Sequence, residues 1–167
     1  VYDYYKQAVA LSKKYHMPII LRLTTHVCHA KQRVAFAGYT PLPNDDTPRF
    51  DARNGPYIPL TKDVFEKKRR ALQNLAAVSE DAETSKLNFV VDHHNSKRGV
   101  LTMGLPFLAL MDVLESTHAK PDVLKLGVVY PVPRTLIRNF VERHEEVKIL
   151  EELDDILEDE VKRIAYD

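Results

Sequence analysis

The sequence VLKLGVVYPVPRTLIRNF, from Val123 to Phe140, indicates an α/β fold. It opens with an apolar run that is typical of a strand buried on both faces. A helical pattern begins near Thr135, directly after a Tyr-Pro-Val-Pro junction. Pro131 disfavours helix at the residue before it, and Pro133 suits a first helical turn, where its missing N–H is no loss. We therefore expect a stiff elbow between a buried strand and a helix.

The segments around this elbow alternate between strand and helix. Strands are expected at 99–104, 123–129 and 147–150, and they are followed by helices at 107–115, 135–142 and 156–164. The sequence LNFVVD, residues 87–92, predicts a further strand at an edge of the sheet. Because such alternation implies parallel crossovers, we predict a three-layer α/β/α sandwich with a mostly parallel sheet.

The first 80 residues have a different organisation. Residues 2–15 place apolar side chains at helical spacing, and PIILRLTT, residues 18–25, is predicted as a buried strand. Residues 38–60 hold five of the ten prolines and are expected to form an extended linker, before a helix that Thr61 caps. The domains expected are 1–37, a linker with a helix at 38–80, and the regular domain at 81–167.

Composition limits the functions open to the chain. Its 167 residues carry 24 basic and 24 acidic side chains, so no net field favours nucleic acid or an anionic membrane as a partner. The basic run Lys67–Arg70 and the acidic stretch 142–167 are most simply two solvated helix faces, and the alternative is a partner-binding patch. The single cysteine, Cys28, excludes an internal disulfide and fits a cytoplasmic location. No apolar run approaches the ~20 residues of a membrane span.

The carboxyl ends of parallel strands are where open α/β sheets bind ligands. Those ends carry Gly104, the pair Tyr130–Pro131, and Glu151 with Glu152. Gly104 lacks the further glycines of a dinucleotide-binding loop, so we favour a simple tight turn over a phosphate site. Neighbouring residues of a strand point to opposite faces, so Glu151 and Glu152 do not form a general acid–base pair. We expect them to cap a helix or to meet a partner.

The stretch TTHVCHAK, from Thr24 to Lys31, has the greatest density of reactive side chains. Cys28 and His29 are adjacent, and adjacent residues seldom face each other as a nucleophile pair must. Two interpretations remain, a polar strand end that lines a cofactor cleft and a loop without a chemical role. The pair His93–His94 lies beside Asp92 but lacks a fourth ligand at a familiar spacing, so we favour a solvated loop over a metal site.

Several stretches, in this order, resemble the 2-oxoacid:ferredoxin oxidoreductases, and within them the alpha subunits of indolepyruvate ferredoxin oxidoreductases. AVALSKKYHMPIILRLTTHVCHAK resembles the last helix and strand of that family's pyrimidine-binding thiamine domain, and GVLTMGLPFLALMDVLE resembles the first strand and helix of the next domain. The most specific match is VLKLGVVYPVPRTLIRNFVERHEEVKILEELDDILEDEV. The thiamine-domain pattern Arg-x-Thr-Thr-x-Val-x-His is matched by Arg22, Thr24, Thr25, Val27 and His29.

The resemblance implies that residues 81–167 form a transketolase C-terminal-like domain, preceded by a helix–strand remnant of a pyrimidine-binding domain. The candidates that it implies for a cofactor or substrate cleft are Arg22, Thr24, Thr25 and His29. The candidates for a domain interface are Gly104, Tyr130, Pro131, Glu151 and Glu152. No catalytic or metal-ligating residue is expected in this chain. The turn MGLPF departs from the Ser-Gly expected there in the family.

For a complete enzyme, the resemblance implies thiamine diphosphate, Mg²⁺, [4Fe-4S] clusters and CoA, used to convert arylpyruvates to acyl-CoA with ferredoxin as electron acceptor. The catalytic glutamate would lie before Val1, and the diphosphate-binding domain and the cluster cysteines after Asp167. We therefore expect an internal fragment that is inactive alone and binds none of these cofactors by itself. Its expected partners are the remaining domains of the alpha subunit, a small beta subunit and ferredoxin.

Two other classes of protein fit the sequence less well. A free-standing flavodoxin-like binding or regulatory module is the alternative, although such a domain usually has about five strands with their own crossover helices. A hydrolase is disfavoured, since the chain has no Gly-x-Ser-x-Gly elbow. Because a fragment exposes apolar surface that neighbouring domains would cover, we also expect the isolated chain to self-associate.

Overall fold

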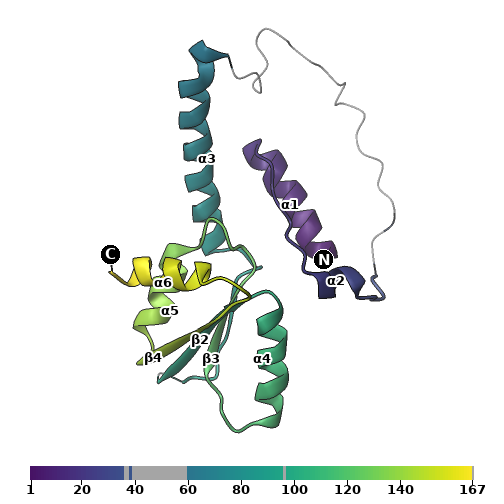
Figure 1. The fold of residues 1–167 in the computed structure, drawn as a ribbon, viewed down its shortest axis with the longest axis vertical. Coiled ribbons are helices and arrows are strands. Elements are labelled where there is room, and N and C mark those ends of the chain that lie inside the picture. The colour runs from purple at the N-terminus through teal and green to yellow at the C-terminus, as the bar shows by residue number, and fades with distance from the viewer. Residues whose placement is uncertain (36–37, 39–59, 96, 167) are drawn as a thin grey trace. The chain divides into compact units, whose positions relative to one another are not determined.

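A computed structural model describes residues 1–35, 38, 60–95 and 97–166 of the chain (Figure 1). The chain divides into two compact units, Val1–Asn74 and Leu75–Asp167. No helix in the described part of the chain has the length and apolar character needed to cross a membrane.

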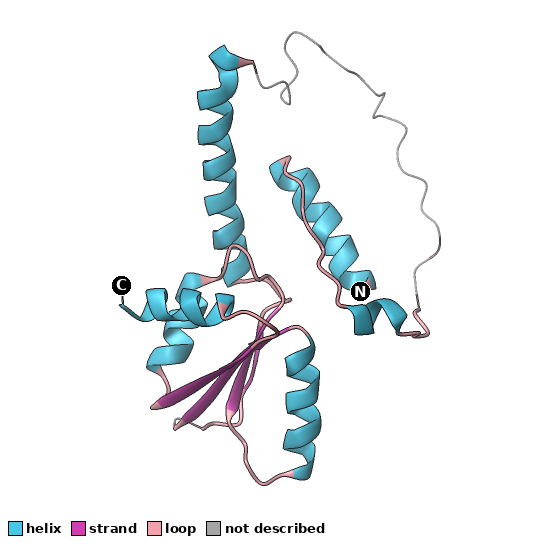
Figure 2. Ribbon diagram, in the orientation of Figure 1, coloured by secondary structure: helices cyan, strands magenta, loops and turns pink. Residues whose placement is uncertain are grey.

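The second unit is built on a four-stranded sheet with the order β1–β3–β2–β4 (Figure 2). Its strands are β1 (Phe89–Val91), β2 (Arg98–Met103), β3 (Asp122–Leu126) and β4 (Glu146–Leu150). β2 pairs in parallel with both β3 and β4, whereas β1 pairs antiparallel with β3. The three parallel strands and the additional edge strand confirm the sheet that was predicted from the sequence.

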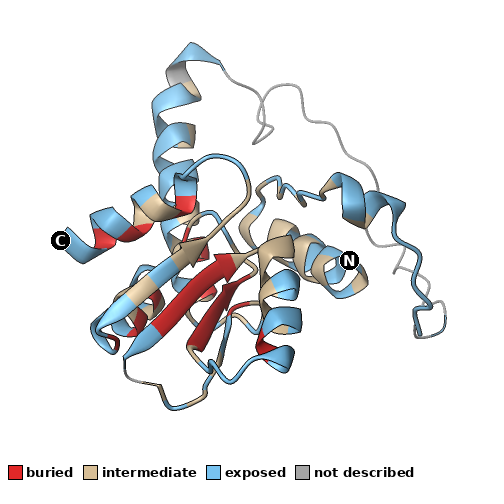
Figure 3. Cartoon of the chain, turned by 60° about the horizontal axis from the view of Figure 1, so that its bottom comes forward, coloured by how far each residue is buried: buried red, intermediate tan, exposed pale blue. Residues whose placement is uncertain are grey.

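Helices cover both faces of this sheet and give it three layers. α4 (Leu105–Ser116) packs on one face, around the buried residues Val100, Leu114 and Val123. α5 (Arg134–Glu142) and α6 (Ile156–Tyr166) pack on the other. The larger buried cluster there contains Leu101, Leu124, Leu126, Val132, Ile137, Phe140, Leu157, Val161 and Ile164. Figure 3 shows that the central strands are the most deeply buried elements, and the predicted α/β/α sandwich is confirmed.

The central strand β3 ends three residues earlier than the predicted strand 123–129. The side-chain oxygen Oδ1 of Asn88 accepts the backbone N–H groups of Gly127, at 2.8 Å, and Val128, at 3.0 Å. These two N–H groups therefore form hydrogen bonds with a side chain and not with a neighbouring strand, so β3 ends before them. The distance in sequence between Asn88 and the strand end explains why local pattern did not predict this boundary.

The first unit contains α1 (Tyr2–Tyr15), as predicted, and a short helix α2 (Thr25–His29). Between them the chain is extended, but it forms no strand pair within the described residues, so the predicted strand at 18–25 is wrong there. A strand needs a neighbouring edge, and the side chain of Ile20, 91% exposed, shows that no such neighbour covers this apolar run. The helix–strand remnant is thus a helix followed by an extended segment.

The helix α3 (Val64–Glu83) follows a 3₁₀ turn, η1 (Thr61–Asp63). The expectation that Thr61 caps this helix is wrong, because the turn already begins at Thr61 and the N–H of Asp63 bonds the carbonyl of Leu60 at 2.9 Å. The linker predicted for 38–60 lies outside the described residues except for Gly38 and Leu60. α3 runs through the boundary expected at 80/81, and that division into domains stays a prediction.

Gly99 lies in β2 beneath two rings. A Cβ atom at this position would lie 2.8 Å from Cε1 of Phe140 and 3.0 Å from Cγ of His144, too close for either ring to stay in place. We expect Gly99→Ala to lower the free energy of unfolding by about 1–3 kcal/mol in urea titrations. Gly38→Ala, at an exposed position with no atom within 4 Å, is the control, with an expected change within ~0.5 kcal/mol. Equal effects of the two substitutions would contradict this account.

Candidate functional site

The carboxyl edge of the sheet is formed by three loops, which follow β2, β3 and β4 at Gly104, 127–133 and 151–155. Gly104 has φ +63° and ψ −142°, a backbone conformation that favours glycine, and it is the N-cap residue directly before α4. A Cβ atom there would lie 3.7 Å from Oε2 of Glu152, so the loop after β4 lies against the turn after β2. The structure thus brings Gly104 and Glu152 together, and their role at an interface stays a prediction.

The elbow after β3 contains a cis peptide bond between Tyr130 and Pro131. Tyr130 is 76% exposed, whereas Pro133 is buried and lies directly before α5. The end of α3 also contacts the elbow. Ser79 donates its hydroxyl to the carbonyl of Val132 at 3.2 Å. The elbow is therefore fixed by tertiary contacts in addition to its prolines.

The first turns of α5 and α6 are both capped by glutamates, one from α3 and one from the loop directly before α6. Glu83 accepts the N–H groups of Thr135 and Leu136, each at 2.8 Å. Glu151 accepts those of Leu157, at 2.8 Å, and Glu158, at 3.0 Å. Glu151 thus meets the expectation that one of the two glutamates after β4 caps a helix. These carboxylates satisfy donors that would otherwise be available to a bound anion.

The four candidates for a cofactor or substrate cleft lie on the extended segment and on α2. Arg22, Thr25 and His29 are exposed, and Thr24 is the residue before α2, with its carbonyl accepting the N–H of Cys28 at 3.0 Å. The hydroxyl oxygen of Thr24 is buried and has no hydrogen-bond partner among the described residues. A buried hydroxyl without a partner is unfavourable, so Thr24 carries an unused bonding group at this position.

Sequence reasoning missed an ion cluster at the opposite, amino end of the parallel strands. Asp122 is 1% exposed. One oxygen of its carboxylate accepts a hydrogen bond from Nη2 of Arg143 at 2.6 Å and lies 3.2 Å from Nε2 of His144. Its other oxygen accepts the backbone N–H groups of His93, at 2.7 Å, and Asn95, at 3.1 Å. The sequence signal was an acidic residue at the start of an otherwise apolar buried strand.

The pKa of Asp122 is set by opposing influences. Burial by itself raises the pKa of this carboxyl group. The backbone N–H groups of Asn95 and His93, with His144 and Arg143, outweigh burial, so the pKa of Asp122 lies below its ordinary value of 3.8. The carboxylate is therefore a structural anion that holds the loop between β1 and β2 to the end of α5.

The loop at His93–His94 takes part in this structural network. Nδ1 of His93 lies 2.7 Å from the carbonyl of Pro121, and the N–H of His94 bonds Asp92 at 2.7 Å. Within the ranges that the structure describes, no three His, Cys, Asp or Glu residues gather as a metal site would require.

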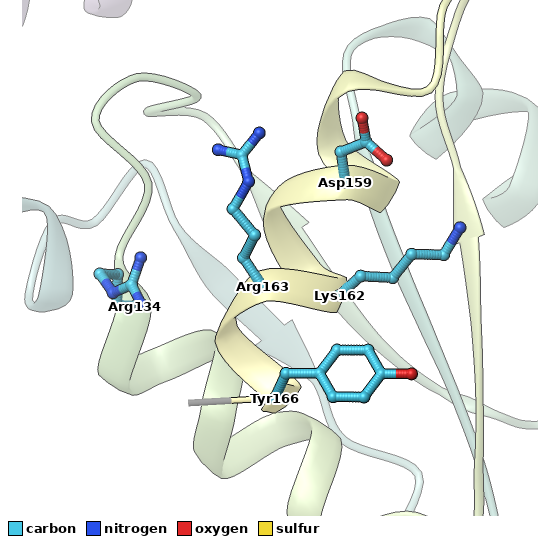
Figure 4. Close-up of a pocket in the computed structure, with 5 residues that line it drawn as sticks. All are labelled: Arg134, Asp159, Lys162, Arg163 and Tyr166. Carbon is cyan, nitrogen blue, oxygen red and sulfur yellow. The ribbon is translucent and has the colours of Figure 1, made fainter.

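A shallow hollow of about 400 Å³ lies between the start of α5 and α6 (Figure 4). Its lining residues are Arg134, Asp159, Lys162, Arg163 and Tyr166. Lys162 pairs with Glu158 at 2.5 Å, and this hydrogen bond raises the pKa of the lysine. Arg163 pairs with Glu160 at 2.7 Å. Because two of its cations, Lys162 and Arg163, are engaged by carboxylates of α6, the hollow is not a built anion site.

The structure thus defines the class of fold: an α/β domain with helices on both faces of a mixed four-stranded sheet. No protein-family model matches the sequence. The chain is 32% identical over 166 residues to the indolepyruvate oxidoreductase subunit IorA of Methanothermobacter thermautotrophicus, and 30% identical over 166 residues to that of Methanothermobacter marburgensis. It is 28% identical over 165 residues to the IorA subunit of Archaeoglobus fulgidus.

These alignments cover 98–99% of the chain but only 26% of each relative. We therefore identify the chain as an IorA-like sequence that spans about a quarter of the length of these relatives. The family resemblance inferred from the sequence motifs is confirmed.

The cap on α5 is testable by removing its carboxylate. Glu83→Ala leaves the N–H groups of Thr135 and Leu136 without their acceptors, so we expect a loss of about 1 kcal/mol in unfolding free energy and faster hydrogen exchange at both amides. Glu80→Ala, at an exposed position on the same helix, is the control and should change neither quantity. Unchanged exchange at the two amides of Glu83→Ala would contradict the cap.

The ion cluster predicts a pH dependence of stability. A carboxyl group with a lowered pKa in the folded state stabilises the protein fully above its unfolded pKa, and this stabilisation is lost as the pH falls through the folded value. We expect Asp122→Asn to lower the free energy of unfolding by about 3 kcal/mol at neutral pH, and by less as the pH falls below 3.8. Asp112→Asn, at an exposed site on α4, is the control and should show a small effect at every pH.

Proposed function

We propose that the chain is part of the alpha subunit of a 2-oxoacid:ferredoxin oxidoreductase that converts arylpyruvates such as indolepyruvate, with CoA, to acyl-CoA and CO₂ while reducing ferredoxin. The observation that carries the proposal is its similarity to IorA subunits along 98–99% of its length. The relatives are named indolepyruvate oxidoreductases, which supports an indole-bearing 2-oxoacid as the substrate.

The second unit serves as a docking scaffold in this proposal. The helix N-termini of α5 and α6 at the carboxyl edge are occupied by the carboxylates of Glu83 and Glu151. Negative charge at these termini repels a phosphate group, so they do not suit a nucleotide or a diphosphate. The exposed Tyr130 and the adjacent Val129, 45% exposed, suit contact with a neighbouring domain instead. Gly104, Pro131 and Glu152 would lie within the same interface.

The first unit would border the cofactor. Thiamine diphosphate, when bound with Mg²⁺, supplies the carbanion chemistry that decarboxylates a 2-oxoacid. The residues of this chain that would face it or the substrate are Arg22, Thr24, Thr25 and His29. They fit such a role because Arg22 and His29 are exposed polar groups and the Thr24 hydroxyl is buried without a partner. Docking of a neighbouring domain would open this position and give the hydroxyl a partner, and the hydroxyl would then help to orient the bound group.

The other parts of the enzyme follow from the same proposal. The remaining domains of the alpha subunit, a small beta subunit and ferredoxin would be partners, in the cytoplasm, and [4Fe-4S] clusters would carry the electrons. The chain by itself would be inactive. A free-standing flavodoxin-like module is the alternative, and two observations disfavour it. The described sheet has only three parallel strands and takes no strand from residues 1–74, and two of its helix N-termini are blocked.

The experiment uses the full-length protein with its partner subunit. We expect indolepyruvate- and CoA-dependent reduction of ferredoxin or a viologen dye, and absence of reduction with both indolepyruvate and phenylpyruvate would refute the substrate class. Thr24→Val removes the buried hydroxyl at nearly constant volume, so kcat/KM should fall about tenfold, the effect of one lost hydrogen bond. Thr117→Val, at an exposed site after α4, is the control with unchanged kcat/KM.

A further inference from the structure

The two compact units carry opposite charge. Residues 1–74 contain 13 lysines and arginines against six acidic residues, a formal charge of +7. Residues 75–167 contain 11 lysines and arginines against 18 acidic residues, a formal charge of −7. The net charge of zero for the whole chain therefore results from two units with opposite net charges. Separated charge of this kind makes one part of a molecule complementary to the other part of a second copy.

The positive charge is concentrated beside exposed apolar side chains on α3. Phe65 is 83% exposed and Leu72 is 53% exposed, and two helical turns separate them, so they lie on the same face. Lys68 and Arg69 flank this stripe at helical spacing, and both are exposed. Arg69 also pairs with Glu66, an exposed contact that is weak in solvent. We name Phe65, Lys68, Arg69 and Leu72 the basic α3 patch.

The negative charge has a matching patch in the loop between β4 and α6. Leu153 is 90% exposed and Ile156 is 65% exposed, with the exposed Asp154 and Asp155 between them. Leu153 has φ +68°, so the chain turns sharply at this apolar residue while its side chain remains in solvent. Glu151 is turned away to cap α6, which leaves the two aspartates as the outward charges. We name Leu153–Ile156 the acidic loop patch.

We propose that the basic α3 patch of one copy docks on the acidic loop patch of a second copy of this chain. Each patch presents two exposed apolar side chains and two charges of one sign, so the pair matches in both respects. Contact between two α3 patches, or between two loop patches, would bring like charges together and is disfavoured. A reciprocal contact, in which each copy contributes both patches, would form a closed dimer. This inference does not depend on the proposed enzymatic activity.

The charge contribution can be tested by swapping its sign. The probe is the purified chain, followed by light scattering or sedimentation over a range of concentrations at about 50 mM and about 500 mM NaCl. We expect concentration-dependent dimers that weaken at the higher salt concentration, since salt screens exposed charges. Lys68→Glu with Arg69→Glu, and separately Asp154→Lys with Asp155→Lys, should each raise the dissociation constant at least tenfold.

The decisive variant combines the two swaps in one chain. Its patches are again complementary with reversed signs, so dimers should return to within about threefold of the original dissociation constant. Lys13→Glu with Lys31→Glu makes the same charge change at other exposed sites of the first unit and should leave association unchanged. Phe65→Ser, which alters no charge, should also weaken the dimer. Helical content from circular dichroism shows that each variant is folded.

Three results would overturn the proposal. The first is a strict monomer at every concentration and salt condition, which would show that the patches do not bind a second copy of this chain. The second is association that neither charge swap weakens, which would place the contact elsewhere on the chain. The third is weakening by both swaps without recovery in the combined variant, because two patches that meet each other must regain complementarity together.

Discussion

The carboxylate of Asp122 is the contact on which the second unit depends. It starts β3, the strand that is buried along its whole length, and it is held by the loop between β1 and β2 and by the end of α5. Three parts of the fold therefore meet at one buried anion. Because a buried charge is tolerated only with partners on every side, this point sets how the strands and α5 are placed.

At the carboxyl edge, carboxylates of the chain occupy positions where ligands often bind in α/β proteins. Glu83 and Glu151 cap α5 and α6, and Asn88 bonds the chain where β3 ends. These contacts rigidify the edge and exclude anions from the helix N-termini. A rigid edge with an exposed aromatic side chain is suited to binding another protein surface.

Prediction from sequence succeeded for elements whose local residue pattern matches their burial in the fold. It failed where a residue distant in sequence determines the structure. The segment from Val123 to Phe140 predicted a buried strand, an elbow and a helix, and all three are present. The strand predicted at 18–25 is absent because apolar residues alone do not pair a backbone without a neighbouring edge. The ion cluster of Asp122 was missed because its partners are separated from it by more than 20 residues. The partnerless hydroxyl of Thr24 is likewise a property of packing, although the motif had pointed to the residue.

The sequence by itself determined the alternation of strands and helices, the family resemblance and the polar residues at the strand ends, because these depend on residue type and on spacing along the chain. Only the tertiary structure decided which glutamate caps which helix, where β3 ends, and that Asp122 is a structural anion. It also decided which apolar side chains of α3 and of the loop after β4 remain exposed. Most of these depend on contacts between residues far apart in sequence, and the cap of α6 depends on how the loop before it turns. Side-chain packing sets such contacts and local periodicity does not.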